Sequence, residues 1–122
     1  MSVKALHARH QFIIKTTPGF DKKAKKILTA ESTESLFDYL EVHPEKGDLI
    51  KGTGGVRKLR WQSGRSKGKS GGVRVLYHYS KDVLIILITL YSKSEKDDIS
   101  GEERNQLKKL MPQLIAKYTD GL

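Results

Sequence analysis

The chain has 122 residues, the length of a single domain with one hydrophobic core. Its composition, 37% apolar and 30% charged, excludes a disordered chain, and the absence of cysteine excludes disulfides, thiolate nucleophiles and cysteine-ligated zinc. Because 23 Lys and Arg outnumber 14 Asp and Glu, the net charge of +9 favours an acidic partner: nucleic acid first, an acidic protein second and a membrane surface third.

Residues 1–10 show no periodicity and are expected to form a flexible tail ahead of a single domain over residues 11–122. The tail lacks an apolar core of signal-peptide length, and no later apolar run is long enough to cross a membrane, so a cytoplasmic protein is expected. His7 and His10 either bind a metal ion as an i, i+3 pair or are solvated. The second interpretation is favoured, because no carboxylate or further histidine lies nearby in the sequence.

Residues 11–15 (QFIIK) predict a short strand that ends at Thr17-Pro18-Gly19. Apolar residues at helical spacing then predict one helix from Phe20 to Leu28 and a second over residues 32–42, ended by Pro44. The two helices are expected to form a hairpin. Four lysines cover the other sides of the first helix, as a solvated face or as phosphate contacts: Lys22, Lys23, Lys25 and Lys26.

After Pro44 the apolar pattern changes from helical spacing to alternation. Residues 56–62 alternate, which places Leu59 and Trp61 on one face of a strand and Lys58, Arg60 and Gln62 on the other.

Residues 73–79 alternate again, with one set on each face: Val75, Tyr77 and Tyr79 together, and Arg74, Leu76 and His78 opposite. The run at 83–91 (VLIILITLY) is apolar at both sets of positions and predicts the central, fully covered strand. The result is a mainly antiparallel meander with helices on one face.

The chain closes with one helix. Ser100 and Glu103 have the spacing of a capping box, in which each side chain bonds a free amide at the helix start. An apolar stripe then runs to Tyr118, and Pro112 is expected to kink or split the helix because it lacks an amide hydrogen.

The positive charge is concentrated in residues 49–81, which hold nine Lys and Arg, no Asp or Glu, and seven of the eleven glycines. Outside this segment the two charge types balance at 14 each. Such a segment either binds polyanions or is an ordinary basic sheet face. Self-repulsion among nine cations favours the first interpretation.

Lys58 and Arg60 are expected on one strand face, about 6.5–7 Å apart, which is near the spacing of phosphates along a stretched nucleic-acid strand. If the next strand pairs antiparallel, Arg74 joins them in a phosphate-binding groove. Further RNA contacts are expected from these residues, of which three lie in the glycine-rich loop at 63–72: Arg57, Arg65, Lys67, Lys69 and Lys96.

For several other polar residues the sequence allows two alternative roles. Tyr91 either packs in the core or reaches the groove, and His78 is either structural or an acid–base group, the structural role being favoured. The acids Glu95, Asp97 and Asp98 either bind a divalent ion or precede the positive end of the last helix, and the second is favoured. No pattern matches a nucleotide or metal site, so no cofactor is expected.

Three segments, GDLIKGTGGVRKLRW, GKSGGVRVLYHY and ITLYSKSEKDDIS, resemble the RelE/HigB superfamily of type II toxins, and its HigB-like branch in particular. The resemblance covers roughly residues 12–114. It implies an α+β domain with a mainly antiparallel four-stranded sheet, an N-terminal helical hairpin and a C-terminal helix. It also implies a metal-independent endoribonuclease that cuts mRNA in the ribosomal A site, and a cognate HigA-like helix-turn-helix antitoxin.

The resemblance also assigns residues. The strand arginine of the family matches Arg74 within residues 72–77 (GVRVLY), the preceding basic pair matches Lys58 and Arg60, and the basic position after the last strand matches Lys93 or Lys96. A tyrosine that RelE has at the start of its last helix is missing here, where the sequence is Ile-Ser-Gly. The general base therefore stays open among Lys58, Lys93 and Tyr91.

The chemistry suits these residues, because RNA supplies its own 2′-hydroxyl nucleophile and the protein needs to hold the geometry, neutralise the transition state and move two protons. Arg74 and Arg60 suit neutralisation as permanently charged, bidentate donors. The alternative is a non-catalytic RNA- or ribosome-binding protein. A third possibility, compatible with either, is that an acidic protein segment docks on the same groove.

Overall fold

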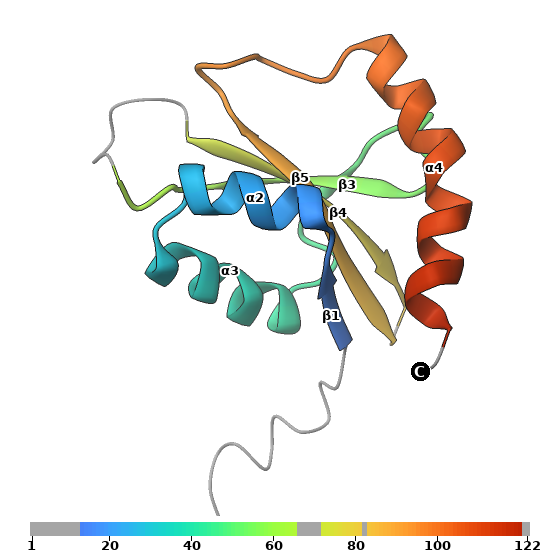
Figure 1. Ribbon diagram of the computed structural model, residues 1–122, viewed down its shortest axis with the longest axis horizontal. Coiled ribbons are helices and arrows are strands. Elements are labelled where there is room, and N and C mark those ends of the chain that lie inside the picture. The colour runs from blue at the N-terminus through green and yellow to red at the C-terminus, as the bar shows by residue number, and fades with distance from the viewer. Residues whose placement is uncertain (1–12, 66–71, 82, 121–122) are drawn as a thin grey trace, which may run out of the picture.

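The computed structural model describes residues 13–65, 72–81 and 83–120, so the predicted tail, Lys67 and Lys69 lie outside the described residues. One five-stranded sheet with the order β1-β5-β4-β3-β2 is flanked by three helices (Figure 1). The strands are β1 (Ile13–Thr16), β2 (Asp48–Leu49), β3 (Val56–Trp61), β4 (Val73–Ser80) and β5 (Leu84–Ser92). The helices are α2 (Pro18–Ile27), α3 (Ala30–Val42) and α4 (Gly101–Thr119).

The sheet confirms the predicted α+β class, because β3, β4 and β5 form an antiparallel meander and β1 adds to β5 in parallel. Two details differ from the prediction. A fifth strand, β2, pairs with β3 over only two residues, too short to show as an alternating pattern. The middle of the sheet is β4, and β5 lies between β4 and the edge strand β1, where apolar side chains are still buried on both faces.

Helices cover both faces of the sheet, so the prediction of one covered face was wrong. The helical hairpin α2–α3 packs on one apolar cluster, which includes Phe20, Leu36, Val75 and Tyr77. Helix α4 packs on a second cluster on the opposite face, with Met111 and Leu114 in one cluster with Leu76 of β4 and several residues of β5. The apolar stripe of α4 requires this second surface, because the first face is already occupied by the hairpin.

The helix ends follow the sequence signals. Thr17 and Thr29 cap α2 and α3 by accepting hydrogen bonds from Phe20 N and Ser32 N, and the predicted capping box of α4 is present at Ser100. Helix α4 continues through Pro112, so a split helix was the wrong expectation: Pro112 is exposed while the stripe on either side of it stays buried. None of the helices in the described ranges is long and apolar enough to cross a membrane.

A bulge interrupts the pairing of β4 with β5. Leu76 pairs with Thr89 but Tyr77 pairs with Leu87, so Ile88 is one residue in excess on β5. The hydroxyl of Thr17 donates to the carbonyl of Ile88 over 2.7 Å while accepting from Phe20 N over 3.0 Å. One threonine therefore joins the start of α2 to the bulge.

Replacing Thr17 tests this link. Thr17→Val keeps the size of the side chain but removes both hydrogen bonds, and we expect it to lower the free energy of unfolding by about 1–3 kcal/mol. Thr17→Ser retains the hydroxyl and should cost less than about 1 kcal/mol. Urea unfolding of both variants measures the difference, and equal losses would show that the hydroxyl is not the stabilising group.

Candidate functional site

A row of four polar side chains, two from β3 and one each from β4 and β5, lies on the face that α4 partly covers. Arg60 pairs directly with Arg74, and Arg74 pairs directly with Tyr91 on its other side. Lys58 pairs with Leu76 and lies on the same face, two residues from Arg60. We call Lys58, Arg60, Arg74 and Tyr91 the basic row. The predicted strand alternation is confirmed, and it brings four of the five expected catalytic residues together.

The members of the row differ in exposure. Arg60 is exposed, whereas Arg74 is only 8% exposed and Tyr91 only 1%. Like charges directly opposite each other in a sheet are destabilising, so the Arg60–Arg74 pair costs folding free energy. Two guanidinium groups held in this way form a ready site for an anion, which each can bind through paired N–H donors.

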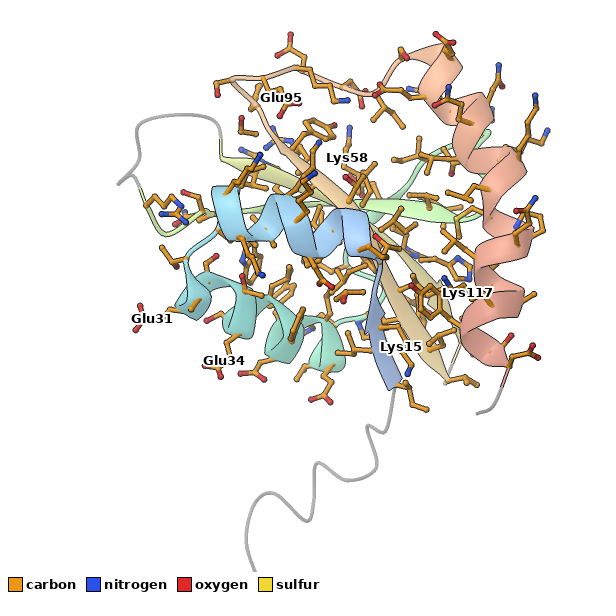
Figure 2. The ribbon with its side chains drawn as sticks, in the orientation of Figure 1. Lys15, Glu31, Glu34, Lys58, Glu95 and Lys117 are labelled. Atoms are coloured by element: carbon orange, nitrogen blue, oxygen red, sulfur yellow. The ribbon has the colours of Figure 1, made fainter. Side chains whose placement is uncertain are left out.

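A carboxylate lies against the row from the segment that connects β5 to α4. One oxygen of Asp98 is 3.3 Å from the Lys58 ammonium and the other is 3.9 Å from the Arg104 guanidinium (Figure 2 labels Lys58). Burial raises the pKa of Asp98, but hydrogen bonds from the Ile99 amide and from Lys58, with the nearby charges of Lys58 and Arg104, lower it by more. The pKa therefore lies below its ordinary value and Asp98 is an anion.

The same segment brings Lys96 to the row. Its ammonium lies 5.0 Å from the centre of the Tyr91 ring and 2.6 Å from a carboxylate oxygen of Glu103, whose pKa is lowered chiefly by that hydrogen bond. Lys93 is exposed, and its backbone N–H donates to the carbonyl of Gly72, just before β4. Lys96 therefore contacts the basic row through the ring of Tyr91.

Tyr91 is buried in the row with its hydroxyl next to charged groups. Burial raises its pKa to about 12, with Asp98 raising it further and Arg74 opposing. Among the described residues the hydroxyl has no hydrogen-bond partner within bonding distance, although Asp98 lies near enough to raise its pKa both by its charge and by a hydrogen bond. At neutral pH Tyr91 is therefore protonated, so it can donate a proton and is a poor base.

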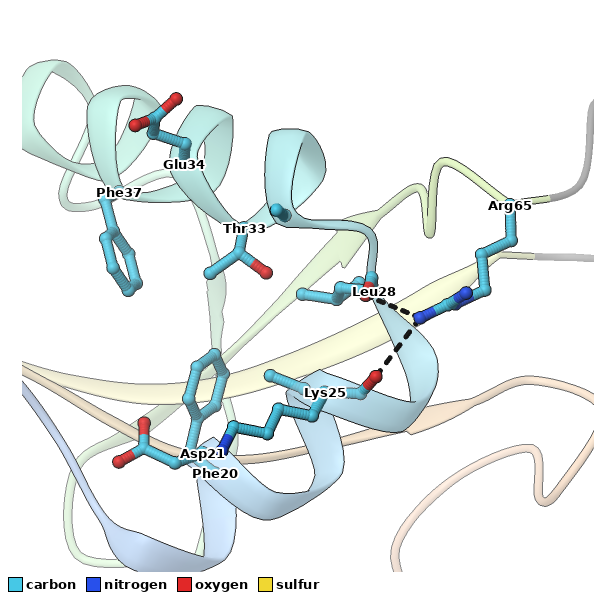
Figure 3. A pocket seen from close by; sticks show the side chains of 10 residues that line it. Phe20, Asp21, Lys25, Leu28, Thr33, Glu34, Phe37 and Arg65 are labelled. Atoms are coloured by element: carbon cyan, nitrogen blue, oxygen red, sulfur yellow. Dashed lines mark hydrogen bonds between the residues drawn. The ribbon is translucent and has the colours of Figure 1, made fainter.

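Two of the expected RNA-binding arginines have structural hydrogen bonds. Arg57 donates to the carbonyls of Glu45 and Gly47, which holds the connection between α3 and β2. Arg65 donates to three carbonyls at the end of α2, from Lys25, Ile27 and Leu28, two of which are drawn in Figure 3. A cation at the C-terminal end of a helix also interacts favourably with the negative end of the helix dipole. Arg65 is therefore bound to the end of α2, although it lies in the glycine-rich segment from which RNA contacts were predicted.

Arg65 also lines a pocket of about 710 Å³ between α2 and α3, together with Phe20, Leu28 and Phe37 (Figure 3). The pocket is on the hairpin side, whereas the basic row is on the opposite face of the sheet. The two features are therefore separate sites.

His78 and the acids before the last helix were the remaining candidates for acid–base or metal chemistry. Both ring nitrogens of His78 have partners, the carbonyl of Gly55 at 2.8 Å and the hydroxyl of Ser80 at 2.9 Å, which confirms the favoured structural role. No group of three potential metal ligands occurs within the described part of the chain. The sequence points to Asp98 only as one of three acids before the last helix, and nothing in it singles out Arg104.

The raised pKa of Tyr91 predicts a pH dependence of stability. Because the folded protein keeps the hydroxyl neutral until the pH nears 12, its stabilising effect is complete below pH 10 and is lost between pH 10 and about 12. The wild type should lose more free energy of unfolding over that interval than Tyr91→Phe, as measured by urea unfolding at matched pH. Equal losses would contradict the raised pKa.

Comparison with known proteins identifies the family. The model of the RelE toxin of the RelE/RelB toxin-antitoxin system matches residues 13–122. Among solved structures, the chain is similar to the archaeal RelE–RelB complex from Pyrococcus horikoshii OT3, at 25% identity over 70% of this chain and 98% of that chain, with a TM-score of 0.46. The HigB-like branch stays a prediction. Since the family model covers nearly the whole chain, this protein belongs to the RelE toxin family.

Proposed function

We propose that this RelE-family toxin is a ribosome-dependent endoribonuclease that cleaves mRNA in the A site and so inhibits translation. The observation that supports this most is the row Arg60–Arg74–Tyr91, in which two arginines and a protonated tyrosine adjoin on three neighbouring strands. Such a set can bind a phosphodiester and supply a proton. That RelE toxins are generally endoribonucleases also supports the proposal.

The reaction needs no external nucleophile. The ribose 2′-hydroxyl gives its proton to solvent water while its oxygen attacks the adjacent phosphorus. The bond to the 5′-oxygen of the next nucleotide breaks, and the products are a 2′,3′-cyclic phosphate and a 5′-hydroxyl. Arg74 and Arg60 stabilise the extra negative charge on the pentacoordinate phosphorus. Tyr91, being protonated, donates a proton to the leaving 5′-oxygen.

Lys58, one of the three candidates for the general base, is given a different role in this proposal. Its neighbour in the structure is the Asp98 carboxylate at 3.3 Å, so it does not lie among cations alone. We assign Lys58 to phosphate binding beside Arg60. We propose that Lys93 and Lys96 contact the substrate strand at the same edge of the row. The predicted RNA contacts of Lys67 and Lys69 stay predictions, and those of Arg57 and Arg65 would require the hydrogen bonds that these arginines make within the fold to open.

The toxin is proposed to act with a cognate antitoxin, which the family description supports. A HigA-like helix-turn-helix protein is the expected type. An acidic segment of the antitoxin would neutralise the basic row and exclude RNA from it, which makes antitoxin binding and substrate binding compete. A cytoplasmic location follows from this function, since mRNA and ribosomes are the substrate and its platform.

Arg74 is the residue whose loss tests the function. Arg74→Ala removes the central cation of the row, and we expect growth arrest on induction to disappear and mRNA cleavage to fall by about 100- to 1000-fold. Arg74→Lys keeps the charge but not the paired donors and should lie between the two. Lys117→Ala, at the far end of α4, is the control and should arrest growth like the wild type (Figure 2).

Primer extension on mRNA from induced cells separates this proposal from its alternative. New 5′ ends that depend on Arg74 indicate cleavage, whereas a non-catalytic RNA- or ribosome-binding protein arrests growth without creating them. Undiminished arrest and unchanged 5′ ends in Arg74→Ala would refute the assignment of the row.

A further inference from the structure

Asp98 is an anion placed inside a cationic surface, and its two oxygens face two different cations. One oxygen lies 3.3 Å from Lys58 on β3, and the other lies 3.9 Å from Arg104 on α4. This is how the two free oxygens of a phosphodiester approach two cationic side chains. The carboxylate therefore has the charge and the contacts of a bound phosphate.

Some hydrogen-bond donors near the Asp98 carboxylate lack an acceptor within bonding distance. In the described part of the chain, the buried Nε of Arg104 has no hydrogen-bond partner, and the buried Tyr91 hydroxyl has none within bonding distance, although a hydrogen bond with Asp98 is among the causes of its raised pKa. Tyr91 is 99% buried by surface area, at 1% exposure, and Asp98 is the charge that acts most strongly on it. Buried donors without partners are costly, so their presence points to an acceptor that the carboxylate replaces only in part. A phosphate offers more acceptor positions than a carboxylate does.

We propose that Asp98 is an internal phosphate mimic that an RNA phosphate displaces, and that Arg104 is a further phosphate-binding residue. The inference rests on the proposed RNA-binding function of the basic row. In the free toxin Asp98 keeps Lys58 and Arg104 close together despite their like charges. When RNA binds, one of its phosphates takes the place of the carboxylate.

The strand spacing fixes where this phosphate lies relative to the reaction. Lys58 and Arg60 are two residues apart on one strand face, about 6.5–7 Å. A phosphate between Lys58 and Arg104 is therefore a neighbour of the phosphate between Arg60 and Arg74. The displaced position holds the strand next to the scissile bond, and Arg104 positions the substrate without touching the reacting atoms.

Displacement is feasible because Asp98 is held weakly. Its side chain is 45% exposed, and exposed ion pairs contribute little because water and salt screen them. Its strongest local contact is with the next amide, Ile99 N, at 2.8 Å. A phosphate, with its stronger acceptor oxygens, competes successfully for the two cations.

The experiment measures binding of a short single-stranded 2′-O-methyl RNA, which cannot be cleaved because its 2′-oxygen is blocked, to the full chain at low salt. Asp98→Asn removes the charge but keeps an oxygen for Ile99 N. Asp97→Asn is the matched control, because it changes the net charge equally at the neighbouring, exposed position. We expect Asp98→Asn to bind about three- to fivefold tighter than the wild type, and Asp97→Asn to stay within about twofold.

Arg104 supplies the second comparison. Arg104→Ala should weaken binding by about fivefold, and adding Asp98→Asn to it should give less gain than in the wild type, since the displaced site then lacks one cation. Unfolding midpoints of all variants confirm that they are folded. Equal effects of Asp98→Asn and Asp97→Asn, a loss of affinity in Asp98→Asn, or no RNA binding by any variant would each overturn the inference.

This result is separable from the test of cleavage. A toxin that binds RNA with the expected pattern but produces no new 5′ ends retains the phosphate mimic and loses the endonuclease assignment. Cleavage that depends on Arg74, with no difference in RNA affinity between Asp98→Asn and Asp97→Asn, retains the endonuclease assignment and loses the phosphate mimic.

Discussion

Between Leu87 and Thr89, β5 contains one residue more than the part of β4 with which it pairs. Without the bulge, the alternation seen up to Leu87 would continue through Ile88, and Tyr91 would point toward the helical hairpin. With it, Leu90 packs in the cluster under α2 and α3, and Tyr91 lies on the other face beside Arg74. Thr17 bonds the bulge to the start of α2. The chemistry proposed for Tyr91 depends on this single register shift.

The basic row lowers the stability of the folded protein locally, and the rest of the fold compensates for this loss. Arg60 and Arg74 are directly opposed, although like charges in that arrangement repel. Apolar clusters on both faces of the sheet stabilise β4 independently of the row, through residues such as Val75 on one side and Leu76 on the other. In the segment before α4, Asp98 lies 3.3 Å from Lys58 and offsets part of the positive charge of the row. Local conflicts of this kind are expected at functional sites.

The sequence was sufficient for features that depend on near neighbours and insufficient for those that depend on distant ones. Alternation placed Lys58 and Arg60 on one face, and the capping box marked the start of α4. The bulge was not predictable, because a run that is apolar at every position does not show where its alternation shifts. The contacts of Asp98 with Lys58 and of Arg65 with the end of α2 join residues about forty positions apart. Contacts over such distances are visible only in the folded chain. The glycine-rich surroundings of Arg65 hid its anchored position.

The two faces of the sheet use their polar side chains differently. On the hairpin side they stabilise the fold: Trp61 donates to Ser32, and the Tyr77 hydroxyl bonds both Pro44 and Gly47. On the other side α4 covers only part of the sheet, and in the basic row the exposed Arg60 lies beside Arg74 on the neighbouring strand. This row offers charge and one proton donor, while the substrate supplies the nucleophile. A site equipped in this way gains rate only when its RNA is already held in line for attack. That requirement is what makes dependence on the ribosome, as a second scaffold for the mRNA, physically reasonable for this toxin.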